Sequence, residues 1–78
     1  MKPLVTEKAV MMIERENILT FELEKILGKE EIKKKVEDLF NVKVKKVRTL
    51  IRGNKKFAYV KLKKEFPAID LATKLGMM

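Results

Sequence analysis

The fold of this chain depends most on residues 41–64, which read NVKVKKVRTLIRGNKKFAYVKLKK. Apolar and charged residues alternate in two runs, 41–51 and 55–64, and a period of two is typical of half-buried strands. The short segment between the runs contains Gly53 and Asn54, which favour a tight turn. The whole stretch therefore predicts a β-hairpin.

The two predicted strands differ in regularity. The first alternates through residues 42–45 and then changes phase at Lys46 and Val47, which predicts a bulge or a local twist. The second alternates throughout, and its two faces carry Ala58, Val60 and Leu62 on one side and Phe57, Tyr59, Lys61 and Lys63 on the other. We expect the apolar face to pack against helices.

The segment before the hairpin predicts a helix and then a strand. Thr6 is placed to cap a helix from Glu7 to about Glu16, with Val5 and Val10 spaced as a hydrophobic staple. Residues 17–24 then alternate as a strand does. The expected buried side chains are Ala9, Met12 and Ile13 in the helix and Leu19, Phe21 and Leu23 in the strand.

Two more helices complete the predicted fold. Residues 28–40 have acids in the first turn and place Ile32, Val36, Leu39 and Phe40 on one face. Pro67 fits the first turn of a last helix, which buries Ala68, Leu71, Ala72 and Leu75 and ends at Gly76. The order helix-strand-helix-strand-strand-helix predicts a single α+β domain over residues 1–78, with an antiparallel sheet of three to four strands packed against helices.

Charge is distributed unevenly along the chain. Residues 1–40 carry eight basic and nine acidic side chains, and residues 65–78 carry one basic and two acidic, so both segments are nearly neutral. Residues 41–64 carry ten basic side chains and no acid, which accounts for the overall charge of +8. A solvated lysine-rich surface would explain the Lys33–Lys35 run, which has acids on both sides at helical spacing, but not the missing acids of residues 41–64. We therefore expect this segment to bind a polyanion.

The composition argues against catalysis and against bound cofactors. Cysteine and histidine are both absent, which removes thiolate ligands and the side chain best suited to proton transfer near neutral pH. The acids Glu30, Glu31, Glu37 and Asp38 are expected to form surface ion pairs, and Met11, Met12, Met77 and Met78 to be core or end residues. No secretory signal and no run of ~18 apolar residues is present, so we expect a cytoplasmic protein without membrane insertion.

The predicted hairpin has the side chains that structured RNA requires. Lysines neutralise phosphates, and Arg48 or Arg52 can bind a phosphate with two hydrogen bonds. Tyr59, Thr49 and Asn54 can add stacking or hydrogen bonds, although Phe57 and Tyr59 can equally be packed under a helix. Residues 55–62, KKFAYVKL, are similar to the first ribonucleoprotein motif of RNA recognition motifs, but Lys56 replaces the motif's glycine and Leu62 its last aromatic residue.

Residues 4–9, LVTEKA, together with Asn17 and Phe21 in the first predicted strand, begin a pattern that extends over nearly the whole chain. The pattern resembles the ribosomal protein L23 family, and its ending, residues 70–76, is similar to the archaeal and eukaryotic form of the family rather than the bacterial one. The other matching residues are Glu31, Ile32, Lys33, Val36, Glu37, Leu39, Phe40, Val42, Val44, Val47, Thr49, Leu50, residues 58–62, and Ala72, Leu75 and Gly76.

The resemblance implies a structural protein of the large ribosomal subunit that binds rRNA near the exit of the polypeptide tunnel. Its partners would be large-subunit rRNA, neighbouring ribosomal proteins, and the signal recognition particle or other exit-site factors, with no small-molecule substrate. Together with the charge argument it predicts an RNA-binding surface of Thr6, Lys8, Lys43, Lys45, Lys46, Arg48, Thr49, Arg52, Asn54, Lys55, Lys56, Tyr59, Lys61 and Lys63. The resemblance places partner docking at Glu14, Arg15 and Glu16.

The chain also departs from the family pattern. Arg48 stands where the family usually has Asn, and Phe57 where it usually has a basic residue. The turn at residues 52–54 is far shorter than the long bacterial hairpin loop, so we do not expect it to reach a nascent chain inside the tunnel. Two alternatives stay open, a free-standing RNA-binding module or nucleic-acid chaperone, and a protein-interaction module whose basic strand docks on an acidic partner.

Overall fold

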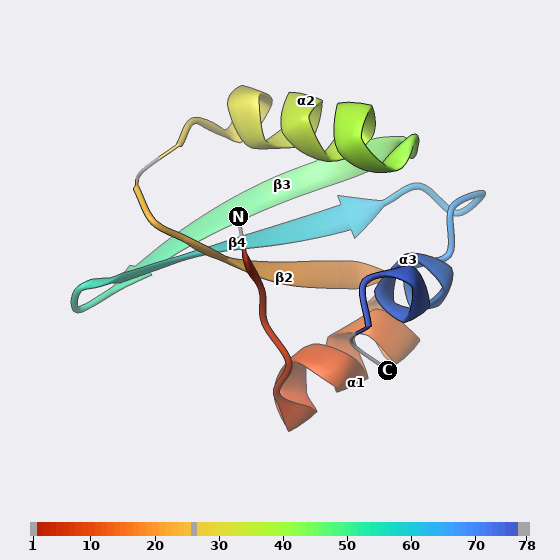
Figure 1. Ribbon diagram of the computed structural model, residues 1–78, viewed down its shortest axis with the longest axis horizontal. Helices are drawn as coiled ribbons and strands as arrows, with labels where there is room; N and C mark the ends of the chain where they lie inside the picture. The colour runs from red at the N-terminus through yellow and green to blue at the C-terminus, as the bar shows by residue number, and fades with distance from the viewer. Residues whose placement is uncertain (1, 26, 77–78) are drawn as a thin grey trace.

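The computed structural model describes residues 2–25 and 27–76, which form an α+β fold of three helices and one four-stranded antiparallel sheet (Figure 1). The predicted helices and strands follow one another in the predicted order, with one additional short strand, β1, before them, and Met77 and Met78 lie outside the described residues. The elements are β1 (Lys2–Pro3), α1 (Glu7–Glu16), β2 (Ile18–Leu23), α2 (Lys29–Phe40), β3 (Val44–Arg52), β4 (Lys55–Leu62) and α3 (Ala68–Lys74).

The sheet has the order β1-β2-β4-β3, so β4 is central and β3 forms a long edge. β1 was not predicted from the sequence, because two residues are too few to show a period. It forms only through pairing, with Lys2 opposite Glu22 and Pro3 opposite Phe21. α2 lies along β3, whereas α1 and α3 lie together beside β2 (Figure 1).

The β3–β4 hairpin has the predicted irregularity and the predicted short turn. Val44 pairs with Leu62 and Lys46 with Lys61, so Lys45 is the extra residue of a bulge, which confirms the expected change of phase. The turn contains Gly53 and Asn54, and Gly53 has φ of +62°. Glycine adopts this conformation without a steric penalty, and a glycine in the first central position is typical of a type II′ turn.

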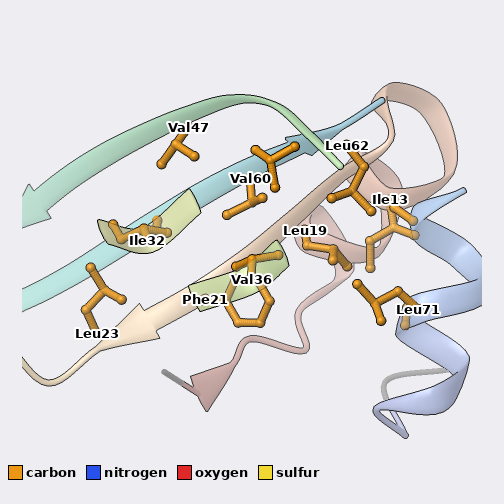
Figure 2. Close-up of a cluster of buried hydrophobic side chains, with 14 residues drawn as sticks. Ile13, Leu19, Phe21, Leu23, Ile32, Val36, Val47, Val60, Leu62 and Leu71 are labelled. Atoms are coloured by element: carbon orange, nitrogen blue, oxygen red, sulfur yellow. The ribbon is translucent and has the colours of Figure 1, made fainter. Parts of the chain in front are cut away.

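One apolar cluster holds the layers together. The buried side chains of β2, β3 and β4 meet Ile32 and Val36 of α2, while at one end of the cluster Ile13 of α1 lies next to Leu62 and to Leu71 of α3 (Figure 2). The rings of Phe21 and Phe40 stack with centroids 6.4 Å apart. The cluster contains Ile13, Leu19, Phe21, Leu23, Ile32, Val36, Val44, Val47, Ala58, Val60, Leu62, Ala68, Leu71 and Ala72.

Two of the predicted core residues are not in the core. Leu39 is 67% exposed, whereas the neighbouring Phe40 packs against the cluster and stacks on Phe21. Leu39 instead lines a shallow hollow with Pro3 and Leu75. Met12 is only half-buried, and it faces a groove described below rather than the cluster.

Side-chain hydrogen bonds join the elements at their ends. The Thr6 hydroxyl accepts from the Ala9 N–H at 3.1 Å, as predicted for the cap of α1. Asn17 ends α1 in the left-handed region, and its amide donates to the carbonyls of Leu62 and Phe66. Its Oδ1 accepts from the N–H of Ala68. This one side chain therefore connects α1, β4 and α3, a role that the sequence did not indicate.

Glu37 was expected to form a surface ion pair, but its carboxylate has a different partner. It accepts a hydrogen bond from the backbone N–H of Val44 at 2.9 Å. The bond connects the last part of α2 to the first residue of β3, across the turn at Asn41. It therefore helps to fix where the basic strand begins.

Candidate nucleic-acid interface

The sheet face opposite α2 carries three rows of side chains that cross β2, β4 and β3. Because residues directly opposite each other in an antiparallel sheet point to the same side, the pairing register defines each row. The rows are Ile18, Lys61 and Lys46; then Thr20, Tyr59 and Arg48; then Glu22, Phe57 and Leu50. We call this surface the α1 face.

Burial on the α1 face decreases from β2 to β3. In the middle row Thr20 is 2% exposed, Tyr59 is half-buried and Arg48 is exposed. Helix α1 contacts β2, and Lys8 and Met12, one helical turn apart, share a hollow with Arg48 and Tyr59. The helix therefore lies on the β2 side of this face and leaves the β3 side open.

Between α1 and β3 runs a groove made of two adjoining hollows of about 240 and 200 Å³. Ile18, Arg48 and Tyr59 line both hollows, so Tyr59 lies where they meet. We call this feature the α1–β3 groove. The first hollow is completed by Lys8, Met12, Thr49 and Leu50, and the second by Glu16, Lys46 and Lys61.

The groove is strongly cationic. Lys8, Lys46, Arg48 and Lys61 line it, and Glu16 is the one acid among its lining residues. Lys46 lies directly opposite Lys61, and Arg52 directly opposite Lys55. Like charges in directly opposed positions destabilise a sheet, and an anion bound between them removes that repulsion. The arrangement is therefore suited to phosphate groups.

A model of a known protein family matches most of the chain. The model described as Ribosomal protein L23 matches residues 1–69, which is most of the 78-residue chain. The chain belongs to the ribosomal protein L23 family. As a member of this family it is a structural component and not an enzyme.

A relative from an archaeon is similar over nearly its whole length. It is the large ribosomal subunit protein uL23 of Pyrobaculum aerophilum, which is 53% identical over 76 residues. The match covers 95% of this chain and 93% of that protein. The family resemblance and its archaeal character, both noted in the sequence, are confirmed.

In this member of the L23 family some of the predicted RNA-binding residues lie together in the groove, and the others lie outside it. Six of them line the α1–β3 groove, and Arg52 and Lys55 continue the same face toward the turn. The six are Lys8, Lys46, Arg48, Thr49, Tyr59 and Lys61. Of these, Thr49 lies opposite Ala58, on the side of the sheet that faces α2, so it borders the first hollow from the other face of β3.

The remaining predicted residues lie outside the groove. Lys56 pairs with Ile51 and Leu23, which places it on the side of the sheet that faces α2. Lys63 donates its backbone N–H to the carbonyl of Lys43 at the end of the hairpin remote from the turn. The others are Thr6, which caps α1, Lys45, which forms the bulge, and Asn54, which is in the turn.

The apolar part of the groove was not predicted from the sequence. Met12, Ile18 and Leu50 line it, yet none was named as a site residue, and Glu16 was assigned only to partner docking. Strand alternation, counted from the bulge, would have placed Leu50 on the same face as Lys46 and Arg48. That count needs the position of the bulge, and the contact with Met12 needs the tertiary structure.

The predicted docking residues lie at the end of α1. Arg15 and Glu16 line a hollow of about 580 Å³ on this helix together with Met11, which is 40% exposed. Glu14 is exposed but does not line that hollow. Among residues 2–25 and 27–76 there is no cluster of acids that could hold a metal ion and no helix long and apolar enough to cross a membrane.

Proposed function

We propose that this chain is a constituent of the large ribosomal subunit and binds large-subunit rRNA through the β3–β4 hairpin and the α1–β3 groove. The observation that carries the proposal is the pairing of like charges, Lys46 with Lys61 and Arg52 with Lys55, in a segment without acids. Like charges directly opposite each other destabilise a sheet, and phosphates bound against them would relieve that repulsion. The name of the archaeal relative, a large ribosomal subunit protein, supports the choice of particle.

The proposal extends to the position of the chain in the particle. The family resemblance supports a place near the tunnel exit, among neighbouring ribosomal proteins of the cytoplasmic ribosome. There the exposed side of α1, with Glu14, Arg15 and Glu16, would help to form the docking surface for the signal recognition particle or other nascent-chain factors. A crosslinking map of the native particle tests this placement, which fails if α1 crosslinks only to rRNA.

RNA binding is tested with the purified chain and deproteinised large-subunit rRNA. With roughly five to eight phosphate contacts, log affinity should fall against log salt with a slope on the order of −4 to −7. We expect a clear preference for large-subunit rRNA over random RNA at physiological salt. Equal affinity for both would contradict a specific rRNA-binding function.

Sedimentation distinguishes a ribosomal protein from a free-standing RNA-binding module. If the proposal is right, the chain sediments stoichiometrically with large subunits after a high-salt wash. A chain found only in the free fractions would favour a nucleic-acid chaperone or a protein-interaction module.

A further inference from the structure

The α1–β3 groove contains more than phosphate binding requires. Phosphates are bound by cations and N–H donors, but Met12, Ile18 and Leu50 also line the first hollow and offer neither. The phenol ring of Tyr59 lies half-buried between this apolar wall and the cations of the second hollow. A ligand that uses the whole groove must therefore have an apolar planar part and an anionic part side by side.

A single nucleotide of an unpaired RNA segment has that composition. Unstacked bases of structured RNA are bound by stacking on aromatic side chains, while lysine and arginine hold the backbone. The first hollow, about 240 Å³, is below the ~300 Å³ lower limit of pockets for drug-sized molecules, so it suits one ring system. Its cations, Lys8 and Arg48, can engage the polar edge of a base or the flanking phosphate.

We propose that the first hollow receives one unstacked base of the bound rRNA, stacked on Tyr59, while Lys46, Arg48 and Lys61 hold an adjacent phosphate in the second hollow. The inference rests on the proposed function and adds how the RNA is recognised. Charge complementarity selects the occupant, since four cations and one acid line the groove. Tyr59 and Arg48 border both hollows, so the base and its phosphate occupy them together.

This arrangement differs from stacking on an open sheet. An RNA recognition motif would use Phe57 and Tyr59 alike, since both lie on the α1 face of the central strand. Phe57, however, lines neither hollow of the groove. Base insertion therefore requires Tyr59 and not Phe57, which makes Phe57→Ala a matched control.

The test follows methyl groups of the full chain by NMR, with methionine Cε labelled, on adding the shortest large-subunit rRNA fragment that retains full affinity. A base in the hollow should shift the Met12 methyl upfield through its ring current. Met11 is the internal control, because it lies on the same helix but does not line the groove. This measurement uses the native protein, so it does not depend on whether a variant folds.

Variants provide the second measurement. Tyr59→Ala should weaken rRNA binding by about 10-fold without changing the salt slope, because stacking contributes no phosphate contact. Tyr59→Phe should bind as the native chain does, and Phe57→Ala should have little effect. Thermal melting of each variant shows whether it is folded.

The outcomes separate this inference from the function on which it rests. Two results would overturn base insertion and leave rRNA binding in place. The first is salt-dependent binding of rRNA that does not move the Met12 methyl resonance. The second is an equal loss of affinity for Tyr59→Ala and Phe57→Ala. If the chain shows no preference for rRNA, both proposals fail.

Discussion

Helix α2 and the β3–β4 hairpin are both rich in lysine, but they have opposite roles. In α2 four lysines are accompanied by four acids at helical spacing, so the segment has no net charge. In the two strands of the hairpin seven basic side chains have no acid among them. The comparison shows that the sign of the neighbouring charges, and not the number of lysines, distinguishes a solvated surface from one prepared for an anion.

The two regions also differ in what they contribute to the fold. α2 buries Ile32 and Val36 completely against the sheet, and its charges are on the exposed side. β3 buries only Val44 and Val47, and the rest of that strand is exposed. The fold therefore depends on the apolar side of α2, and we expect binding to depend on the exposed side of the hairpin. Substitutions in the two regions should separate stability from affinity.

The largest effect is expected from shortening a buried side chain of α2. Ile32→Ala should lower the free energy of unfolding by about 2 to 5 kcal/mol, because it removes buried methyl groups and leaves a cavity. For a domain of this size that is most of its stability. Leu50→Ala, at a 38% exposed position of β3, should change it by less than about 1 kcal/mol. Urea unfolding measures the stability of both variants. Equal losses of stability would show that α2 and the exposed part of β3 contribute equally to the fold, against this prediction.

Next in size is charge reversal in the hairpin. Lys46→Glu combined with Arg48→Glu should weaken rRNA binding on the order of 100-fold at physiological salt, since two phosphate contacts become repulsive. Lys33→Glu combined with Lys34→Glu in α2 is the matched control and should change affinity little. Filter binding compares the two variants. Similar losses would indicate a response to net charge alone and refute the assigned surface.

A smaller effect on stability is expected from replacing two glycines, Gly53 in the turn of the hairpin and Gly28 just before α2. Gly53→Ala should lower stability by about 1 to 2 kcal/mol, because φ of +62° is strained for a residue with a Cβ. Gly28→Ala, before α2, should be nearly neutral, since its φ is −69° and an added Cβ meets no atom within 4 Å. Thermal melting checks the difference, and an unaffected Gly53→Ala variant would contradict the turn conformation.

The smallest predicted effect is on stability, which two charge reversals, Lys46→Glu and Lys34→Glu, should change in opposite directions. Lys46→Glu alone should raise the stability of the free protein by about 0.2 to 1 kcal/mol, because it replaces a like-charge pair with Lys61 by an opposite-charge pair. Lys34→Glu should lower it by about 0.5 kcal/mol, because Glu30 and Asp38 lie four residues away on either side. Urea unfolding at low salt resolves the two. A destabilised Lys46→Glu variant would indicate that the like-charge pair does not strain the sheet.

Most of the elements could be predicted because their signals are local. Three such signals are found where expected: the helix cap at Thr6, the turn at Gly53, and the alternation of buried residues at Ala58, Val60 and Leu62. Each of them acts within a few residues of the chain. The errors occurred where burial depends on a distant partner. Leu39 has the spacing of a core residue but is 67% exposed, whereas the neighbouring Phe40 stacks on Phe21. Likewise Asn17 is at the end of a helix in the sequence, and its hydrogen-bond partners lie about 50 residues away.

By itself the sequence determined the order of elements, the face of each helix that is buried, and the concentration of positive charge in residues 41–64. These follow from periodicity and composition, which are properties of neighbouring residues. The tertiary structure alone decided that the lysines and arginines are divided between two faces, and that Tyr59 lies where a hollow with an apolar wall adjoins a second, cationic hollow. The physical reason is that the bulge at Lys45 sets which side chains of β3 face α1, and the groove exists only where the helix and that strand come together.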